Sequence, residues 1–451
     1  MKSEAPVTST IYALSSAAGR AAVAVIRISG PRAGTILNVM APPRPKPRTN
    51  ALRDILHPEN ATILDKGLIL WFPGPRSFTG EDFAEIQIHG GRAVVAAVLE
   101  AIGRIPDCRI AEAGEFARRA FHNGKLDLAE AEGLADLLSA ETEAQREQAL
   151  RQAKGELSAL IESWRSSIVE SLSYVEATID FSDETDVAKD IFDKARSIIQ
   201  TLEISISHYL DDANRGEILR DGFRVVLAGP PNVGKSSLLN ALARKEAALV
   251  SEEAGTTRDV IEVHLNIEGF PVILSDTAGL RQTEMRIESA GILKALETVR
   301  EADLILCLID PNSPQKQIPE DLKPYADRIL LVFNKSDLIK DRSDLALPDD
   351  GILLSAKSGQ GIKDLTKRLG EIVKHRLANR THTPSITNAR QRALVLEAHR
   401  NLKSFLEKNP HDVELRAEDL RHAAHSLGRL TGRIEVEEIL DRIFSRFCIG
   451  K

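Results

Sequence analysis

One nine-residue stretch, residues 229–237, constrains this chain more than any other. It reads Gly-Pro-Pro-Asn-Val-Gly-Lys-Ser-Ser and fits G-x-x-x-x-G-K-[ST], the pattern of a phosphate-binding loop. An apolar run at 223–228 precedes it, as expected of a buried strand, and a helical pattern follows from Ser236. In this setting glycines let successive backbone N–H groups converge on an anion, and the helix N-terminus adds partial positive charge. The stretch therefore predicts a nucleotide-binding site rather than a simple Gly/Pro turn.

Two side chains of this loop have predicted roles. Lys235 is expected to reach the β- and γ-phosphates, which makes it a candidate catalytic residue as well as a ligand. Ser236 is expected to offer its hydroxyl to Mg²⁺. The other loop residues expected to line the phosphates are Asn232, Val233, Gly234 and Ser237.

Further motifs follow in the chain order of a guanine-nucleotide switch. Residues 255–259 supply Thr257 for Mg²⁺ and the γ-phosphate, and Asp276, after a predicted strand, is expected to hold Mg²⁺ through water. In the run 334–337 the Asp337 carboxylate can accept two guanine N–H groups, a donor pair that adenine lacks. Together the motifs predict GTP binding, with these further ligands: Thr277, Ala278, Gly279, Asn334, Lys335, Ser355, Ala356 and Lys357.

The position that orients the attacking water in Ras-type proteins is occupied by Leu280, which cannot do so. Glu288 is the candidate replacement, and the alternative is that it is a solvated helix residue. No arginine has an obvious finger position, although such a charge contributes about 10³–10⁵ in rate. The carbonyl oxygen of Asn232 is suited to holding a monovalent cation there instead, and the alternative is that Asn232 only forms the turn.

Composition limits the partners and the compartment. The chain has 451 residues and a net charge of −7, which argues against a strong autonomous nucleic-acid binder. RNA contacts are therefore expected to be local, weak or shared with a partner, and the proline-rich basic run at 41–48 reads more readily as a solvated loop. Three widely separated cysteines fit no metal spacing and indicate a reducing cytosol. The longest apolar run, 93–99, is too short to span a bilayer.

Periodicity divides the chain into four segments. Residues 1–124 mix strands and helices, and Glu85–His89 alternates between polar and apolar side chains as a strand does. Residues 125–219 are helical, with one apolar stripe from Leu157 to Ile179, and helical patterns resume in 377–451. We therefore expect one discontinuous helical domain with an α/β nucleotide-binding domain, 220–376, inserted into it.

The chain resembles the MnmE (TrmE) family of tRNA modification GTPases nearly from end to end. Besides the switch motifs, the resemblance is carried by Gly19-Arg20, 25–30 (Val-Ile-Arg-Ile-Ser-Gly), 77–82 (Ser-Phe-Thr-Gly-Glu-Asp), 89–91 (His-Gly-Gly), 114–116 (Gly-Glu-Phe), 123–128 (Asn-Gly-Lys-Leu-Asp-Leu) and the terminal Phe-Cys-Ile-Gly-Lys, 447–451. It implies an α+β N-terminal domain that binds folate and dimerises, a helical domain, and an inserted Ras-like G domain.

The resemblance also implies ligands that the residues alone do not show. K⁺-dependent dimerisation of G domains would activate hydrolysis, with Glu288 positioning water. The K⁺ would be surrounded by Asn232, Ser251, Glu253 and Thr256. Of these, Ser251 and Thr256 would also contact GTP. The Mg²⁺ would be held by Ser236 and Thr257. A tetrahydrofolate derivative, 5,10-methylene or 5-formyl, would be bound by Arg27, Glu85, Lys125 and Lys451.

The implied partners are a second copy of the chain, tRNA, and the FAD- and NADH-using protein MnmG (GidA), in a heterotetramer. The complex would add an aminomethyl or carboxymethylaminomethyl group to C5 of the wobble uridine (U34). Cys448 is a catalytic candidate by resemblance, and a tail cysteine of structural use is an equal alternative. The run 15–22 departs from the family's Pro-Pro-Gly-Arg-Gly, and the side chains of 281–288 also differ.

Two other functions compete with this one. A regulatory RNA- or ribosome-binding GTPase of the Era or Der type would carry similar switch motifs, but the KH-like or tandem G domain it needs is not visible. A folate-binding scaffold with residual GTPase activity is opposed by the intact Lys235, Thr257, Asp276 and Glu288. His422 and His425 lie three apart on a predicted helix, where a solvated face is more plausible than a metal pair.

Overall fold

A computed structural model describes most of the chain in two compact units. Unit 1 comprises residues 1–135, 152–195 and 408–451, and unit 2 comprises 136–151 and 196–407. The described residues are 9–180, 185–245, 262–276, 297–313, 317–339, 348, 351–377, 384–409, 412–434, 437–445, 447 and 449–450. The helices are shared between the units, so the four-segment division at 124/125, 219/220 and 376/377 stays a prediction.

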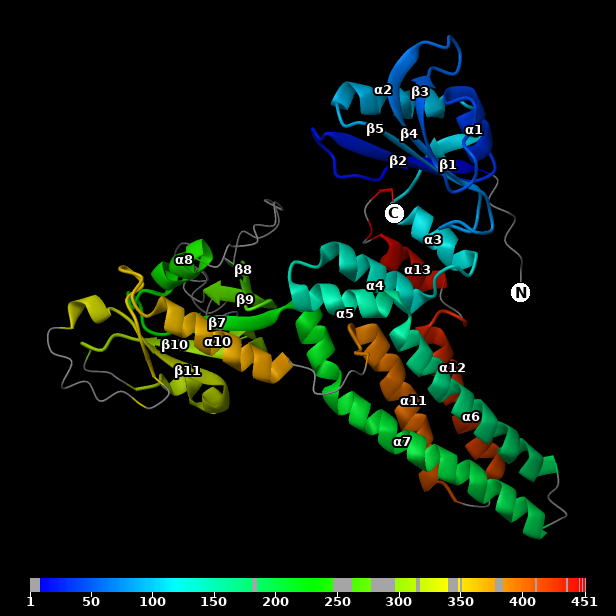
Figure 1. The fold of residues 1–451 in the computed structure, drawn as a ribbon. Helices are drawn as coiled ribbons and strands as arrows, with labels where there is room; N and C mark the ends of the chain where they lie inside the picture. Colours follow the sequence, from blue (N-terminus) through cyan, green and yellow to red (C-terminus); the bar gives the residue numbers. More distant parts are fainter. Residues whose placement is uncertain are drawn as a thin grey trace, which may run out of the picture. The chain divides into compact units, whose positions relative to one another are not determined.

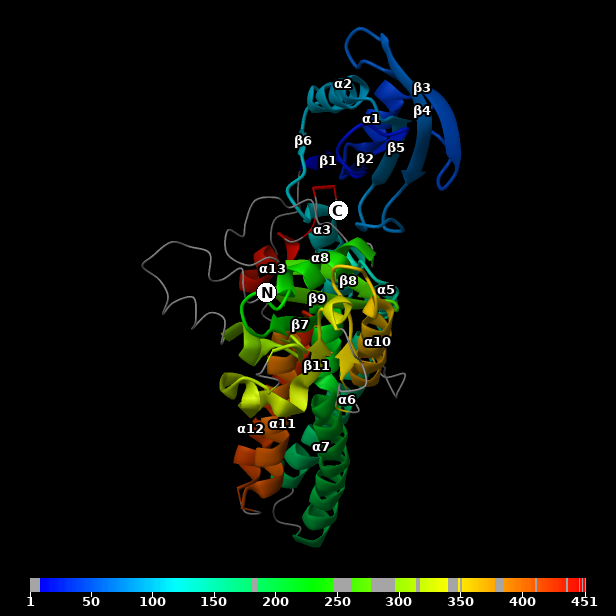
Figure 2. The ribbon, with the colours of Figure 1, turned by 90° about the vertical axis from the view of Figure 1, so that its left-hand side faces the viewer.

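Unit 1 contains a six-stranded sheet in the order β3-β4-β5-β2-β1-β6, in which all neighbours are antiparallel except β1 and β6. Its strands are β1 (Thr10–Leu14), β2 (Val23–Ser29), β3 (Asn50–Leu56), β4 (Ile63–Phe72), β5 (Phe83–His89) and β6 (Cys108–Ile110). Helices α1 (Ala33–Met40) and α2 (Arg92–Gly103) lie against this sheet (Figures 1 and 2). Their apolar side chains share a single core with those of the strands.

The alternation predicted for β5 is confirmed. Ile86 and Ile88 are buried in the core beneath the helices, whereas Glu85 and Gln87 are half-buried and His89 is exposed on the opposite face. Because side chains alternate along a strand, the same opposite face of β2 carries Val23 and Arg27. This sheet therefore keeps one face under helices and presents a mixed polar and apolar surface on the other.

The helical part of unit 1 consists of α3 (Glu115–His122), α4 (Leu128–Ser139), α6 (Glu156–Asp180), α12 (Val413–Leu430) and α13 (Glu437–Phe444). Helix α4 begins with a reciprocal capping box: the Asp127 N–H donates to Glu130 and the Glu130 N–H donates to Asp127, both at 2.8 Å. Helices α6 and α12 lie side by side (Figure 1). The predicted stripe on α6 is buried at Leu157, Ile161, Trp164, Ile168 and Val175.

The C-terminal residues of the chain are built into unit 1. Phe444 and Phe447 pack in a core with Ala117 of α3 and Leu128 of α4. Further on, Ile449 forms a β-bridge with Ala113, and the Gly450 carbonyl accepts a hydrogen bond from the Ser15 hydroxyl at 3.1 Å. Gly450 has a φ of 98°, and a Cβ there would collide with the Leu14 carbonyl, so only glycine fits this contact.

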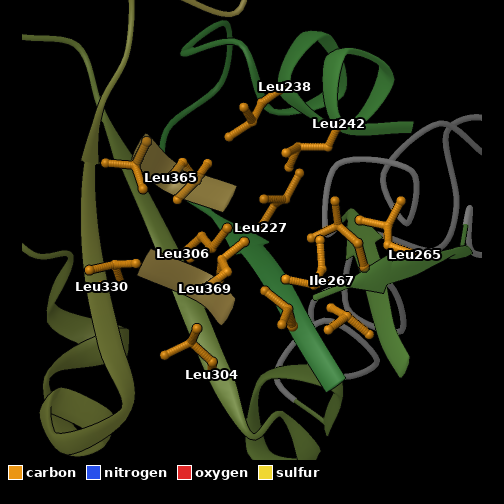
Figure 3. Packing of buried hydrophobic residues seen from close by; sticks show 14 of the residues in the cluster. Leu227, Leu238, Leu242, Leu265, Ile267, Leu304, Leu306, Leu330, Leu365 and Leu369 are labelled. Atoms are coloured by element: carbon orange, nitrogen blue, oxygen red, sulfur yellow. The ribbon is translucent and has the colours of Figure 1, made fainter. Parts of the chain in front are cut away.

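Unit 2 contains the predicted α/β sheet, in the order β12-β11-β10-β7-β9-β8, parallel except for β8. Its strands are β7 (Phe223–Ala228), β8 (Glu262–Ile267), β9 (Phe270–Asp276), β10 (Leu304–Ile309), β11 (Ile329–Phe333) and β12 (Ile352–Leu353). Side chains from the central strands, such as Leu227 and Leu306, pack with Leu238 and Leu242 of α8 (Lys235–Lys245) and with α10 (Ile362–Leu377) (Figure 3).

Two further helices join this sheet to the rest of unit 2: α5 (Glu143–Ala153) and α7 (Thr185–Asp221). The Gln145 side chain donates to the Arg220 carbonyl at 2.9 Å, and the Ala144 N–H donates to the carbonyl of Gly269 in the β8–β9 turn at 3.1 Å. Arg220 also donates to the Asp136 carboxylate at 2.7 Å. The start of α5 thus binds both the end of α7 and the hairpin that lies between the two switch motifs.

The remaining described helices of unit 2 are α11 (Ala389–Glu407) and the short 3₁₀ segments Glu320–Arg328 and Ser336–Leu338. Within the parts of the chain that the structure describes, no helix is both long and apolar enough to cross a membrane. The same described parts hold no cluster of three metal-ligating side chains. His422 is exposed on α12 and pairs with Glu418 at 3.2 Å, as a solvated helix face predicts.

Candidate nucleotide-binding site

The predicted phosphate-binding loop joins β7 to α8 and has the backbone that the motif requires. Gly229 and Gly234 adopt positive φ angles of 140° and 102°, and Asn232 adopts 60°. A Cβ on Gly229 would strike the Leu308 carbonyl of the neighbouring strand, and one on Gly234 would strike the Asn334 side chain. Glycine is therefore needed at both positions for steric as well as conformational reasons. The φ of Asn232 agrees with a turn-forming role and leaves its cation-binding role untested.

Lys235 lies across this loop, with its side chain almost fully buried. Its Nζ donates to the carbonyls of Gly229 and Pro230, both at 2.9 Å. The ammonium is thus held at the opening of the loop, where the N-terminus of α8 also begins. A phosphate that approaches this opening meets a placed positive charge together with the helix terminus.

The two predicted Mg²⁺-side residues meet. The Ser236 hydroxyl at the start of α8 donates to the Asp276 carboxylate at the end of β9, with 2.7 Å between the oxygens. Asp276 is 3% exposed, so its position is fixed by the strand and by this contact. Two hard oxygen donors close together at the phosphate side of the site fit Mg²⁺, which prefers such ligands.

The predicted base-recognition residues form one connected group. Asn334 donates from Nδ2 to the Val233 carbonyl at 2.8 Å, and its Oδ1 accepts the Ala356 N–H at 2.9 Å. The Ser355 hydroxyl donates to Asp337 at 2.6 Å. The loop that follows β11 is thereby tied both to the phosphate loop and to the segment after β12. The residues predicted to bind the phosphates and those predicted to bind the base consequently form one connected group.

One residue of this site was not found by sequence reasoning. Asp310, at the end of β10, accepts a hydrogen bond from Nζ of Lys335 at 2.8 Å. Burial alone would raise the pKa of Asp310, but the hydrogen bonds from Lys335 and the Asn312 N–H outweigh it and lower that pKa. The position of Asp310 in the sequence could have indicated it. An acidic residue directly after a predicted parallel strand lies at the edge of the sheet where ligands bind.

Several predicted ligands lie outside the described residues. They are Ser251, Glu253, Thr256, Thr257, Thr277, Ala278, Gly279 and Glu288 in the nucleotide site, together with Cys448 and Lys451 at the C-terminus. Their assignments stay predictions. Lys357 follows Ala356 in the turn after β12, and Ser237 follows Ser236 in the first turn of α8; their roles also stay predictions.

The three described residues among the predicted folate ligands, Arg27, Glu85 and Lys125, lie in one part of unit 1. Arg27 donates to Glu85 at 3.0 Å across the β2–β5 pair, on the sheet face opposite α1 and α2. At the next position on that face, Ser29 contacts Thr79 of the 77–82 loop at 2.6 Å. A Cβ on Gly80 of this loop would lie 3.1 Å from Cε of Lys125. Arg27, Glu85 and Lys125 are therefore linked through one loop.

That loop rests on a buried charge network that the sequence did not reveal. Arg119 of α3 is 4% exposed and donates to the carboxylates of Glu81 and Glu115, at 3.1 and 2.9 Å. Glu115 also accepts Arg109 at 2.5 Å. Because buried charges are tolerated when they are paired in this way, the network fixes the 77–82 loop against α3.

The two described cysteines are free. Burial raises the pKa of Cys307 in β10 to about 11. Burial likewise raises the pKa of Cys108, which lies in β6. In both residues burial therefore disfavours the thiolate, which is the nucleophilic form.

The fold and the site together define a P-loop nucleotide-binding protein with a Ras-like α/β domain and an additional α+β sheet domain. Comparison with protein families agrees with this class. The family described as "GTP-binding protein TrmE N-terminus" matches residues 10–125, and the family described as "MnmE helical domain" matches residues 128–448. The chain belongs to the MnmE family of tRNA modification GTPases.

Individual relatives cover almost the whole chain. The protein of Paramagnetospirillum magneticum named tRNA modification GTPase MnmE is 49% identical over 99% of this chain and 100% of its own length. The human mitochondrial protein named 5-taurinomethyluridine-[tRNA] synthase subunit GTPB3 is 45% identical over 98% of this chain and 93% of its own. The solved G domain of the T. maritima iron transporter FeoB covers 33% of this chain and 96% of its own, at 27% identity, with a TM-score of 0.25 that carries no argument about fold.

Proposed function

We propose that this chain is the GTP-hydrolysing subunit of a complex that modifies C5 of the wobble uridine in certain tRNAs. The modification would be an aminomethyl or carboxymethylaminomethyl group, installed with an FAD- and NADH-using partner of the MnmG type. The observation that carries the proposal is the joined site, in which Asn334 connects the phosphate loop with the base-recognition segment. The names of relatives that match from end to end supply the tRNA substrate.

GTP and Mg²⁺ are the ligands that this site fits. Backbone N–H groups of residues 232–237 and the Lys235 ammonium would hold the phosphates, and Asp337 would accept the two guanine N–H groups. Mg²⁺ would be held by Ser236 and Thr257, with Asp276 acting through water. The pairing of Ser236 with Asp276 supports this assignment, because it already places both oxygens at the phosphate side.

For hydrolysis we propose that a monovalent cation replaces the missing arginine finger. K⁺ would be held by Asn232, Ser251, Glu253 and Thr256, in a site completed when two G domains meet. Glu288 would orient the attacking water, because Leu280 has no polar group to do so. The positive charge of K⁺ would stabilise charge that develops on the phosphates during transfer.

We further propose that unit 1 binds a tetrahydrofolate derivative and forms the homodimer. Glu85 can accept a pterin donor pair much as Asp337 accepts guanine, while Arg27, Lys125 and Lys451 suit carbonyl and carboxylate groups. The exposed sheet face that holds the Arg27–Glu85 pair also carries Val23 and Leu52, 54% and 55% exposed. Away from Phe83, against which Phe116 of α3 packs, the partly exposed face of mixed character is suited to contact a second copy. For Cys448, catalysis and a structural role in the tail are both retained as hypotheses.

The deciding experiment is mass spectrometry of nucleosides from the tRNA of cells that lack this chain. The wobble uridines should lose the C5 group, and the wild-type gene should restore it. A Glu288→Ala variant should still bind GTP but lose most of its turnover and fail to restore the modification. Unchanged wobble uridines in the deletion strain would refute the proposed function. Full rescue by Glu288→Ala would refute the role of Glu288 alone.

A further inference from the structure

A compact basic surface lies at one edge of the sheet in unit 1. It consists of the five cations Arg44, Lys46, Arg48, Arg53 and Arg76, which we call the basic patch. They come from the proline-rich loop between α1 and β3, from the edge strand β3 itself, and from the loop after β4. Arg53 is half-buried and the other four are exposed.

Hydrogen bonds between neighbouring segments show that the patch is contiguous. Arg53 donates from Nε to the Pro43 carbonyl at 3.2 Å, which ties β3 to the proline-rich loop. The Arg48 N–H donates to the Trp71 carbonyl at 2.8 Å, and the Arg48 guanidinium contacts the Arg76 carbonyl. The loop, the edge strand and the segment after β4 therefore present their charges at one place.

Unlike several arginines of the same unit, the five cations of the basic patch have no acidic partner among the described residues. Arg32 pairs with Asp107, and Arg104 pairs with Glu59 and Glu100. Within the described residues, no member of the basic patch forms an ion pair with a carboxylate. Their charges are consequently not neutralised by the protein, in a chain whose overall net charge is −7.

Two of the guanidinium groups are held by aromatic rings instead. Arg44 stacks 4.9 Å from the ring centre of Trp71, and Arg48 lies 6.0 Å from that of Phe72. A Cβ on Gly34 of α1 would collide with the Arg44 guanidinium, so glycine at this position makes room for the stack. Because cation–π contacts leave the N–H donors of arginine available, the groups are placed for a further ligand without being neutralised.

The backbone at Arg48 supports the same interpretation. Arg48 has a φ of 62°, a left-handed conformation that is uncommon for a residue with a long side chain. Such strained positions concentrate where a side chain is needed at a particular place. Here the turn directs Arg48 back over β4 and against the loop that carries Arg76.

We propose that the basic patch binds the phosphate backbone of the tRNA substrate. Arginine matches phosphate geometry with paired N–H donors, and several unneutralised cations on one surface are the electrostatic signature of nucleic-acid contact. The inference rests on the proposed function for the identity of the RNA. It also accounts for how an acidic protein engages RNA: the contact is confined to one local surface.

The test compares binding of a fluorescein-labelled tRNA transcript to the full-length protein by anisotropy, over about 50 to 200 mM KCl. The variant carries Lys46→Gln, Arg48→Gln and Arg76→Gln. A matched control carries Lys323→Gln, Arg146→Gln and Arg368→Gln, which removes the same charge from exposed residues that are paired with carboxylates. A second variant, Arg48→Lys with Arg76→Lys, keeps the charge.

The patch variant should lose affinity on the order of tenfold, and the slope of log affinity against log salt should fall by about 2 to 3. Two unrelated tRNAs should be affected equally, since phosphate contacts carry no sequence information. The control and the lysine variant should keep the wild-type slope. GTP turnover and the melting temperature of the patch variant, both expected unchanged, establish that it is folded.

An unchanged slope in the patch variant would overturn the inference. If the patch instead binds an acidic protein, the three substitutions should leave the affinity for tRNA and its salt dependence unchanged, and the inference would be overturned in the same way. The two proposals fail separately. Patch-dependent tRNA binding with unaltered wobble uridines in the deletion strain would reject the proposed modification, whereas altered uridines with patch-independent binding would reject the patch.

Discussion

Asp310 holds the side chain of Lys335 in place at the carboxyl edge of the parallel sheet. Lys335 follows β11 in a left-handed conformation, with φ of 69°, and its ammonium is anchored to Asp310 on the neighbouring strand. Because the pKa of Asp310 is lowered in the folded state, this ion pair is intact at neutral pH and is lost only as pH falls through that lowered value.

Replacing Asp310 by Asn should therefore weaken the binding of GDP and GTP roughly fivefold, about 1 kcal/mol for a partly exposed charge-assisted pair. The kcat at saturating GTP should not change, because the residue acts on Lys335 and not on the phosphates. Titration with a fluorescent GDP analogue measures the affinity. Glu320→Gln, which removes a carboxylate from an exposed pair with Lys323, is the control. A normal affinity, or a fall in kcat alone, would contradict the positioning role.

At the scale of elements, the local patterns in the sequence predicted well those structures that are determined locally. The alternation in β5, the apolar runs of β7 and β11, and the proline-rich loop all appear as expected. What could not be predicted depends on residues far apart in the chain. The Arg119 network joins carboxylates 4 and 38 residues away, and the pair of Asp310 with Lys335 spans 25 residues.

Helical periodicity likewise predicted local structure but not the contacts between distant segments. It identified the buried face of α6, but a stripe does not state what will cover it. The structure assigns α6 and α12 to one unit and most of α7 and α11 to the other. For the nucleotide site, motif order predicted the ligands, while the contacts that hold them, such as Asn334 with Val233, required the three-dimensional arrangement.

Helix α7 offers a test of close packing between elements. Ala usually stabilises a helix interior by about 1 kcal/mol relative to Gly. At Gly216, however, a Cβ would overlap the Ile386 carbonyl, whose backbone cannot move aside. Gly216→Ala should therefore destabilise the protein by about 1–3 kcal/mol, measured as a lower midpoint of thermal or urea unfolding.

Gly370 of α10 provides the matched comparison. A Cβ there meets only the exposed side chain of Glu268, which can rotate away. Gly370→Ala should be neutral or stabilising by up to about 1 kcal/mol. Equal destabilisation by both substitutions would show that the backbone contact at Gly216 is not the cause.

At the scale of the whole molecule, the proposed cation mechanism makes hydrolysis depend on the salt and on association. GTP hydrolysis should be faster in K⁺ than in Na⁺ at equal ionic strength, because Na⁺ is smaller and fits the same oxygen ligands less well. The rate per molecule should also rise with protein concentration, since the site is completed by a second G domain. Steady-state assays in the two salts over a range of concentrations measure both effects. Equal rates in the two salts would exclude the cation as a substitute for arginine.

The contact between Gly450 and Ser15 has a consequence for how this protein is made. Unit 1 draws on the first 135 residues and also on residues 408–451, and the core around Phe444 and Phe447 needs both. As the chain leaves the ribosome, residues 196–407 emerge before the segment that completes unit 1. The G domain can thus be fully folded while the sheet ahead of it still lacks its C-terminal support. During synthesis, the residues of the nucleotide switch are therefore made before the segment that completes unit 1.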